Sequence, residues 1–227
     1  MQDDDKRLAA EAAVAEIGDG MLVGLGSGST VAFAIAAIGR RLAEWPAATF
    51  FSTSQRTTNA AREAGIPIAR FADQAELDLV IDGVDEIDPQ FRAIKGGGGA
   101  MLREKIVASA ARRMVAIADG SKRVAGLGKA PVPVEILPFA RSFVAARAKA
   151  LGADPVLRVT PAGKEFRTNQ GNLILDCHFG AITDPQRLAL DIQAIPGALG
   201  HGLFLTEIDA AYVAIDGIVT KMERTAP

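Results

Sequence analysis

The sequence predicts an α/β protein in which helices cover a parallel sheet, followed by a smaller α+β domain. Short apolar strands alternate with helical segments through the first half of the chain, a pattern typical of a parallel sheet with helical crossovers. Beyond Gly128, prolines surround residues 132–137. The strands and helices that follow alternate over about 75 residues, which is enough for a second, small domain. The length of 227 residues accommodates both domains.

The first domain begins with a helix over residues 5–17, where Leu8, Ala12, Ala13 and Ile17 have helical spacing and Gly18 ends the pattern. The apolar runs at 21–23, 49–51, 77–81 and 114–118 predict buried strands. Three further helices are expected between or after these strands, over residues 31–42, 54–63 and 101–111. Residues 119–122 are expected to form a polar loop.

The prolines at 131, 133 and 138 predict that residues 132–137 form a crossing segment into the second domain. Helices are expected at 139–151 and 185–195, a tight turn at 169–172, and strands at 156–159, 173–176 and 202–205. The tail can return to the first sheet as strands 211–215 and 218–220. We therefore expect a first domain of residues 1–129 with 207–227 and a small α+β domain of residues 130–206.

Composition excludes several classes of protein. With 25 basic and 27 acidic residues, the net charge of -2 argues against nucleic-acid binding by bulk charge. The single cysteine, Cys177, excludes intramolecular disulfides and a cysteine-rich zinc site. His178 and His201 are too few for a metal centre built on histidines. An apolar content of 49% excludes a disordered chain.

One stretch resembles a membrane span. Residues 20–39 carry no charge and approach the length that crosses a bilayer. The glycines and hydroxyls between Gly24 and Thr30 interrupt any continuous apolar helix. The N-terminal residues are acidic and lack the basic start of a secretory signal. We therefore expect a cytoplasmic protein with no membrane partner.

Three unusual loops follow predicted strands, and ligands of open parallel sheets collect at those strand ends. The first loop, residues 24–30, combines glycines with Ser27, Ser29 and Thr30 before a helix, which favours a phosphate cradle over a simple glycine turn with a serine cap. No lysine follows Gly28, so the loop is not a nucleotide-hydrolysing P-loop. The dinucleotide-binding pattern also fails, because Ser29 stands where its last glycine is required.

The second loop places four carboxylates within residues 82–88, which allows a solvated loop, a site for proton transfer or a hard-cation site. The third loop, Lys95 followed by glycines 96–99, brings backbone close to a ligand or a neighbouring segment unless it is a flexible linker. Glu104 then falls in the first turn of the next helix, where it can face Lys95 or simply be exposed.

Together these segments resemble ribose-5-phosphate isomerase of the A type, in the family's order and over nearly the whole chain. The matching segments are residues 24–30, 82–87, 95–98, 103–105, 119–122, 131–135 and 195–197. The resemblance implies cofactor-free interconversion of ribose 5-phosphate and ribulose 5-phosphate by a homodimer. It also implies a Rossmann-like sheet domain with a ferredoxin-like lid.

The resemblance also implies roles for individual residues. Glu104 matches the general base, Asp82 and Asp85 the paired acids, and Lys95 the lysine of the glycine turn. The matching substrate-binding positions are Ser27, Gly28, Ser29, Thr30, Gly83, Val84, Gly96, Gly97, Gly98 and Lys122, and Lys6 is a further candidate for the phosphate. Val84 stands where alanine is common and Ser27 where threonine is common. His201 and Cys177 are interpreted as structural.

The implied reaction moves a proton between C2 and C1 through an enediolate, for which a buried carboxylate is a suitable base and a lysine a suitable oxyanion donor. CoA transferases, glucosamine-6-phosphate deaminases and sugar-sensing repressor domains share this sheet and glycine loop. Both histidines fall in the second domain, which disfavours a deaminase, and the 20 residues before the first strand leave no room for a DNA-binding motif. The expected partner is a small sugar phosphate, and no nucleic-acid partner is expected.

Overall fold

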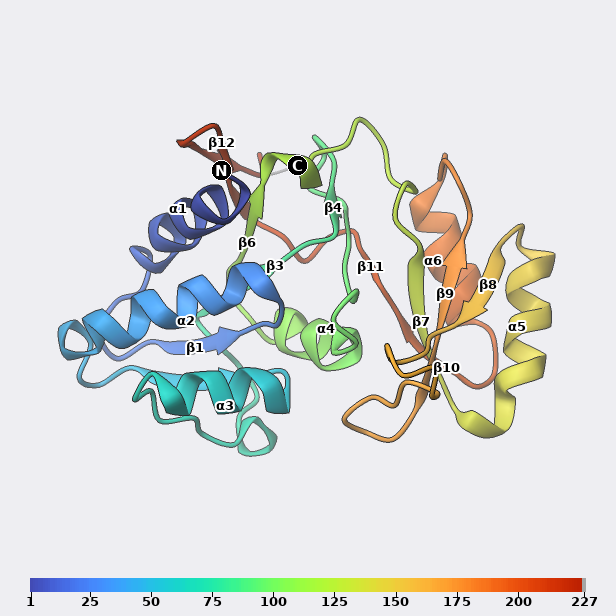
Figure 1. The fold of residues 1–227 in the computed structure, drawn as a ribbon, viewed down its shortest axis with the longest axis horizontal. Helices are drawn as coiled ribbons and strands as arrows, with labels where there is room; N and C mark the ends of the chain where they lie inside the picture. The colour runs from blue at the N-terminus through green and yellow to red at the C-terminus, as the bar shows by residue number, and fades with distance from the viewer. Residues whose placement is uncertain (226–227) are drawn as a thin grey trace. The chain divides into compact units, whose positions relative to one another are not determined.

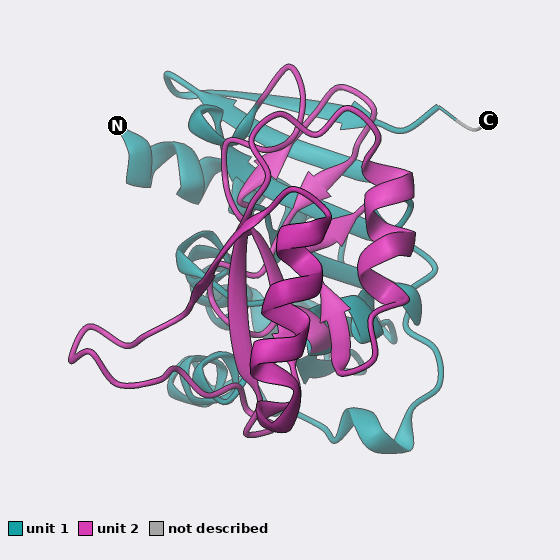
Figure 2. Ribbon diagram, turned by 90° about the vertical axis from the view of Figure 1, so that its right-hand side faces the viewer, with its two compact units in different colours: residues 1–84, 103–123, 206–227 teal, residues 85–102, 124–205 magenta. Residues whose placement is uncertain are grey.

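The computed structural model describes residues 1–225, which form two compact units (Figure 2). Unit 1 comprises residues 1–84, 103–123 and the C-terminal segment from Thr206. Unit 2 comprises residues 85–102 and 124–205. The chain therefore passes between the units four times, and neither unit is a single continuous segment.

Unit 1 is built on a six-stranded sheet with the order β13-β12-β6-β3-β1-β2. All neighbours from β12 to β2 are parallel, and only β13 is antiparallel to its neighbour. The predicted α/β class with a parallel sheet is thus confirmed. The strands are β1 (Leu22–Leu25), β2 (Thr49–Ser52), β3 (Leu79–Gly83), β6 (Met114–Asp119), β12 (Ala210–Ile215) and β13 (Ile218–Glu223).

Helices α1 and α2 lie side by side in unit 1 (Figure 1). Both helices bury alanines, including Ala9, Ala13 and Ala34, in the core cluster of this unit. No helix in the described part of the chain combines the length and apolar character that a membrane crossing requires. The helices on unit 1 segments are α1 (Gln2–Val14), α2 (Ser29–Arg41), α3 (Gln55–Glu63) and α4 (Met101–Ser109), whose first two residues belong to unit 2.

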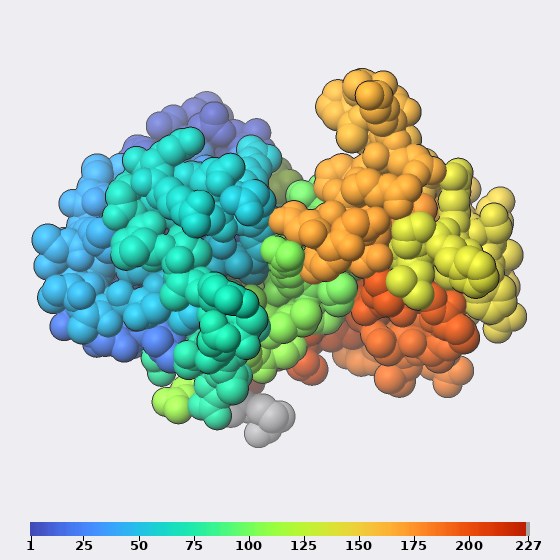
Figure 3. All heavy atoms as spheres, turned by 90° about the horizontal axis from the view of Figure 1, so that it is seen from below, coloured from blue at the N-terminus to red at the C-terminus, as the bar shows by residue number. Residues whose placement is uncertain are grey.

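Unit 2 contains a βαββαβ arrangement whose antiparallel sheet has the order β10-β7-β9-β8, which is the ferredoxin-like fold. Its elements are β7 (Val132–Ile136), α5 (Arg141–Ala150), β8 (Asp154–Leu157), β9 (Leu173–His178), α6 (Pro185–Gln193) and β10 (Ala198–His201). The connection between β8 and β9 projects from this unit (orange in Figure 3). A separate small sheet joins β4 (Glu86–Ile87), β5 (Ala93–Ile94) and β11 (Leu203–Phe204).

Residues 132–137 differ from the sequence expectation, because most of this segment is strand β7 inside the four-stranded sheet. The pairing of β7 with β10 extends from Ile136 only as far as Val134 and does not include Pro133. Pro133 is therefore tolerated, although it has no backbone N–H to donate. The carbonyl of Pro133 still accepts a hydrogen bond of 2.8 Å from the backbone N–H of Gly202. Strands β4, β5 and β10 had no counterpart in the expectation, since two to four residues are too short to show a period.

The compact units also divide the chain differently from the expected domains. Residues 85–102 group with unit 2, because β5 within them pairs with β11 of that unit. The exact domain limits of 1–129 with 207–227 and of 130–206 stay a prediction.

A partly buried carboxylate ties the end of α1 to the sheet of unit 1. Glu16 accepts hydrogen bonds from Arg113 Nε at 2.6 Å and from the Tyr212 hydroxyl at 2.8 Å, and Lys221 Nζ lies 3.2 Å from it. Burial raises the pKa of Glu16, but the hydrogen bonds from these three side chains outweigh burial and lower the pKa from 4.5 to about 2. The ionised carboxylate therefore stabilises the fold.

We predict that Glu16→Gln lowers the free energy of unfolding by about 2 kcal/mol at pH 7. Because the folded-state pKa is depressed, this stabilisation is present above pH 4.5 and is lost as the pH falls from 4.5 towards 2. Urea unfolding of both proteins should show the difference shrinking by more than half by about pH 3. Glu63→Gln, on the exposed side of α3, is the control. An equal difference at pH 7 and below pH 3 would show that Glu16 acts by packing alone.

Candidate active site

Strands β1 and β3 are parallel neighbours, so the glycine loop after β1 and Asp82 near the end of β3 lie at the same edge of the sheet. The Asp82 side chain is buried, with 1% of the residue exposed. Its Oδ1 accepts hydrogen bonds from the backbone N–H of Ser27 at 3.1 Å and of Gly83 at 2.7 Å. Two backbone donors therefore hold this carboxylate against the glycine loop.

The close approach of Asp82 requires glycine at position 26. A Cβ placed there would lie 1.8 Å from Asp82 Cγ, so any side chain would displace the carboxylate. The loop is fixed from both sides, since Gly26 N–H donates to the Ile81 carbonyl at 3.0 Å and the Thr57 hydroxyl donates to the Gly26 carbonyl at 2.7 Å. The neighbouring Gly28 has a φ of 111°, which side chains rarely adopt.

Glu104 is a second buried carboxylate in unit 1. It lies in the first turn of α4 with 3% of the residue exposed, and its Oε1 accepts a hydrogen bond of 2.5 Å from Ser27 Oγ. Ser27 therefore bridges the two acids, because its N–H binds Asp82 and its hydroxyl binds Glu104. The position of Glu104 at the start of a helix also favours its negative charge.

The glycine loop leads into the N-terminus of α2. Gly28 caps this helix without a side-chain hydrogen bond, and its first turn contains no acidic residue. Thr30 is buried in this turn, whereas Ser29 is exposed. Unpaired backbone N–H groups and the helix dipole make such a terminus favourable for an anion.

Lys122 ends a short 3-10 helix, η3 (Gly120–Lys122), that follows β6. Asp119 caps it by accepting a hydrogen bond of 3.0 Å from Ser121 N–H, and Gln2 Nε2 lies 3.4 Å from the same oxygen. Burial raises the pKa of Asp119. The hydrogen bonds from Ser121 and Gln2 and the charge of Lys122 together outweigh burial, so the pKa lies below its ordinary value. The sequence analysis assigned no role to Asp119; its place at a strand end before Gly-Ser is the signal of a cap.

Lys6 lies one turn after Gln2 in α1, on the helix face that meets η3. Its Nζ is 3.1 Å from the exposed carboxylate of Asp3. The Lys6 side chain is mostly covered but Asp3 is largely exposed, so water competes for the Asp3 carboxylate and the ammonium can exchange it for another anion.

Unit 2 carries most of the remaining predicted residues. Asp85 Oδ2 accepts a hydrogen bond of 2.8 Å from Gly97 N–H, which holds the glycine turn after β5. Lys95 is buried, donates its backbone N–H to the Gly202 carbonyl at 2.8 Å, and places Nζ 5.3 Å from the centre of the Phe204 ring. Gly98 is exposed in this turn, and Val84, the last residue of unit 1 before Asp85, is buried.

Arg158 is a residue that the sequence analysis missed. It donates from Nη1 to the carbonyls of Gly96 and Gly97 at 2.8 and 3.1 Å, and it forms an ion pair with Asp176. The carbonyls of the turn are thus fixed from one side while Asp85 holds an N–H from the other. An arginine beyond a short strand has no sequence signal that would distinguish it from a solvated residue.

The other acids of the 82–88 cluster have structural partners. Glu86 accepts hydrogen bonds from the backbone N–H groups of Gly128 and Ala130. Asp88 pairs with Arg92 at 2.6 Å. Within residues 1–225 no group of three or more histidine, cysteine, aspartate or glutamate side chains is arranged to hold a metal ion.

His201 and Cys177, which we interpreted as structural, both lie in unit 2. The Nδ1 atom of His201 accepts a hydrogen bond of 3.3 Å from Leu203 N–H. Cys177 is buried, and burial raises the pKa of its thiol to about 12, which suppresses the reactive thiolate.

The comparisons with known proteins agree on one family. The model of the family described as Ribose 5-phosphate isomerase A (phosphoriboisomerase A) matches residues 49–217. A ribose-5-phosphate isomerase A of Sphingopyxis alaskensis is 49% identical over 97% of this chain and 96% of its own length. The corresponding protein of Methanosarcina acetivorans is 48% identical over 97% of this chain and 94% of its own length.

Solved structures give the same result. A D-ribose-5-phosphate isomerase in complex with phospho-erythronic acid has a TM-score of 0.95 and 33% identity, covering 99% of this chain and all of that one. The ribose 5-phosphate isomerase A of Neisseria gonorrhoeae has a TM-score of 0.93 and 36% identity, covering all of this chain and 99% of that one.

We predict that Gly26→Ala destabilises the protein by about 2 kcal/mol or more, because its Cβ overlaps the Asp82 carboxylate. Thermal or urea unfolding measures this change. Gly126→Ala is the matched control, since a Cβ there meets no atom within 4 Å and the change should stay within about 0.5 kcal/mol. Equal stability of the two variants would show that the loop and Asp82 move apart at little cost.

Proposed function

The chain belongs to the ribose-5-phosphate isomerase A family and interconverts D-ribose 5-phosphate and D-ribulose 5-phosphate, and we propose that Glu104 is the base that carries the proton between C2 and C1. The single observation behind this assignment is the buried carboxylate of Glu104, fixed by a hydrogen bond from Ser27 at the edge of the sheet where ligands collect. The alternatives, a sugar-phosphate sensor, a CoA transferase or a deaminase of the same fold, are not favoured.

The proton transfer needs a carboxylate that is held still and kept from bulk water. Glu104 takes the C2 proton of the open-chain aldose, which leaves an enediolate, and returns that proton to C1. A second proton passes from the oxygen on C2 to the oxygen on C1, which completes the ketose. The Ser27 hydroxyl orients one carboxylate oxygen, so the other is the natural proton acceptor. We assign Ser27 a positioning role towards Glu104 in addition to its backbone contact with Asp82.

Ring opening and oxyanion stabilisation are assigned to the other predicted residues. Ribose 5-phosphate is mostly cyclic, and Asp82 or Asp85 is proposed to take the proton of its anomeric hydroxyl. Lys95, with the N–H groups of Gly96, Gly97 and Gly98, is proposed to stabilise the enediolate oxygen. Gly83 and Val84 are proposed as substrate contacts. For the residues of unit 2 the support is the family resemblance and the local order of their glycine turn.

The phosphate is proposed to bind Ser27, Gly28, Ser29 and Thr30 at the N-terminus of α2, with Lys122 and Lys6 adding positive charge. The α2 terminus, which has no side-chain cap hydrogen bond, and the capped η3 turn support this assignment. The related structure that binds phospho-erythronic acid supports the ligand class, since that molecule carries a phosphate and a carboxylate whose planar shape resembles an enediolate. Phosphate binding far from C1 and C2 orients the reacting carbons over the base.

We further propose a homodimer. Leu137, Phe139 and Phe143 follow one another closely in unit 2 and are 43, 102 and 51% exposed, which is unusual for large apolar residues. A second copy of the chain would remove them from water.

Light scattering at micromolar concentration should give the mass of a dimer. Phe139→Asp should shift the measured mass towards that of the monomer. A monomeric parent protein would refute the proposal. A cytoplasmic location stays a prediction.

We predict that Glu104→Gln lowers kcat by about 10³–10⁴-fold while the dissociation constant for ribose 5-phosphate changes little, because glutamine keeps the shape but cannot accept a proton. The measurement is turnover together with exchange of the C1 hydrogen of ribulose 5-phosphate with deuterated solvent. Glu63→Gln, an exposed glutamate on α3, should leave both unchanged. If Glu104→Gln exchanges that hydrogen at the parent rate, Glu104 is not the base and Asp82 is the next candidate.

We predict that Thr30→Ala raises KM for ribose 5-phosphate more than it lowers kcat, because the phosphate is bound in the ground state and the transition state alike. An increase of about tenfold or more is expected for the loss of one hydrogen bond to a charged group. Steady-state kinetics measures the two constants, with Thr58→Ala on α3 as the control. An unchanged KM would remove Thr30 from the phosphate site.

A further inference from the structure

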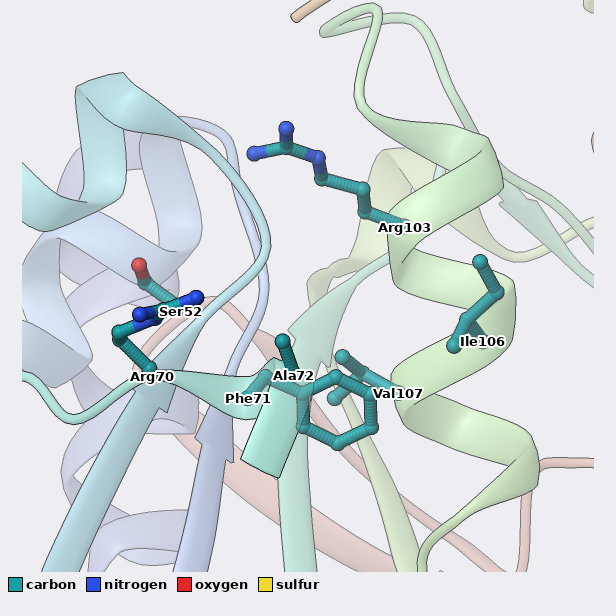
Figure 4. Close-up of a pocket in the computed structure, with 7 residues that line it drawn as sticks. All are labelled: Ser52, Arg70, Phe71, Ala72, Arg103, Ile106 and Val107. Carbon is teal, nitrogen blue, oxygen red and sulfur yellow. The ribbon is translucent and has the colours of Figure 1, made fainter. Parts of the chain in front are cut away.

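Unit 1 contains a pocket of about 420 Å³ that none of the assigned roles uses. It lies at the end of β2, between the 3-10 helix η2 (Phe71–Asp73) and α4, and is open at the surface (Figure 4). Its volume falls in the range of pockets that hold small molecules. Its lining has a charged side and an apolar side, which together specify a ligand class.

The charged side consists of two arginines. Arg103 extends from α4 towards the side of the pocket where Arg70 and Ser52 lie (Figure 4). Within residues 1–225 the Arg103 guanidinium takes part in no hydrogen bond or ion pair. Arg70 lies 3.8 Å from the Asp73 carboxylate, and both side chains are mostly exposed, so this pair is weak. No carboxylate belongs to the described lining, so the pocket has a net positive charge.

The apolar side is formed by Phe71, Ile106 and Val107 (Figure 4). The Phe71 ring is fixed edge-to-face against Phe51, with ring centres 6.2 Å apart. Ile106 remains 49% exposed, so apolar surface stays in water beside the two guanidiniums. A ligand that carries both an anionic group and an apolar body would satisfy both sides.

We infer that this pocket binds a small phosphomonoester attached to an aromatic ring, with the phosphate between Arg70 and Arg103 and the ring against Phe71 and Val107. The guanidinium fork matches two phosphate oxygens at once, which favours phosphate over a single-point anion. The pocket differs from the reaction site, because Glu104 binds Ser27 while its neighbour Arg103 lines the pocket.

The ligand is bound without being chemically changed. The described lining contains no carboxylate, imidazole or thiol that could act as a general base or nucleophile. The Ser52 hydroxyl is hydrogen-bonded to Thr58 Oγ1 at 2.6 Å. The site is therefore a binding site for an effector and does not depend on which residue performs the isomerisation.

The experiment is calorimetric titration of the full chain with phenyl phosphate, in the presence of saturating ribose 5-phosphate so that the sugar-phosphate site stays occupied. Binding should persist under these conditions. Arg70→Ala and Arg103→Ala should each weaken it by about tenfold or more, as expected for losing charge-assisted hydrogen bonds. Arg62→Ala, an exposed arginine on α3 outside the pocket, is the matched control and should bind like the parent.

Inorganic phosphate should bind several-fold more weakly than phenyl phosphate, because it leaves the apolar side exposed. Arg70→Ala should keep the parent KM for ribose 5-phosphate, which shows that this pocket is separate from the reaction site. Because Arg70 is exposed, the substitution should not disturb folding. The inference is overturned if phenyl phosphate fails to bind or is displaced by ribose 5-phosphate. Equal binding by the arginine variants, or equal affinity for inorganic phosphate, would also overturn it.

Discussion

The site in unit 1 depends on keeping two carboxylates buried against a single serine. A buried carboxylate is costly unless hydrogen bonds replace its water. Asp82 receives two backbone N–H groups, and Glu104 receives the Ser27 hydroxyl near a helix N-terminus. Backbone donors can come this close only where the chain has no side chain in the way, which explains why glycine stands at position 26. The glycine loop therefore binds the protein's own acids, and we propose that it binds the phosphate as well.

In unit 2, side chains fix the backbone of a glycine turn. Its glycine turn is held by a carboxylate on one side and a guanidinium on the other, Asp85 to an N–H and Arg158 to two carbonyls. The Phe166 ring closes over Gly99, where a Cβ would lie 2.4 Å from the ring. The turn is consequently a fixed backbone surface, which rules out the flexible linker that four successive glycines allow.

Local patterns in the sequence predicted the parallel sheet, the glycine loop and the acid at the end of β3, because each is encoded within a few neighbouring residues. Glu104 could be placed on a helix start for the same reason. Its hydrogen bond with Ser27 could not be predicted, since the two residues are 77 positions apart and only the folded sheet brings them together. Strand β7 was missed because prolines normally mark chain crossings, and Pro133 is permitted only by where the pairing with β10 stops. Arg158 and Asp119 act through backbone groups, whose positions a sequence does not reveal.

The order of strands in unit 1 has a consequence for synthesis of the chain. Strand β6 lies between β3 and β12, and all six of its residues are buried. On the ribosome, β3 is made before β6, but β12 and β13 follow only after all of unit 2. Until they arrive, β6 is an unprotected apolar edge, the kind of edge that pairs with other chains. Premature termination near residue 205 would leave this edge uncovered, so β12 and β13 also protect the chain against strand pairing with other chains.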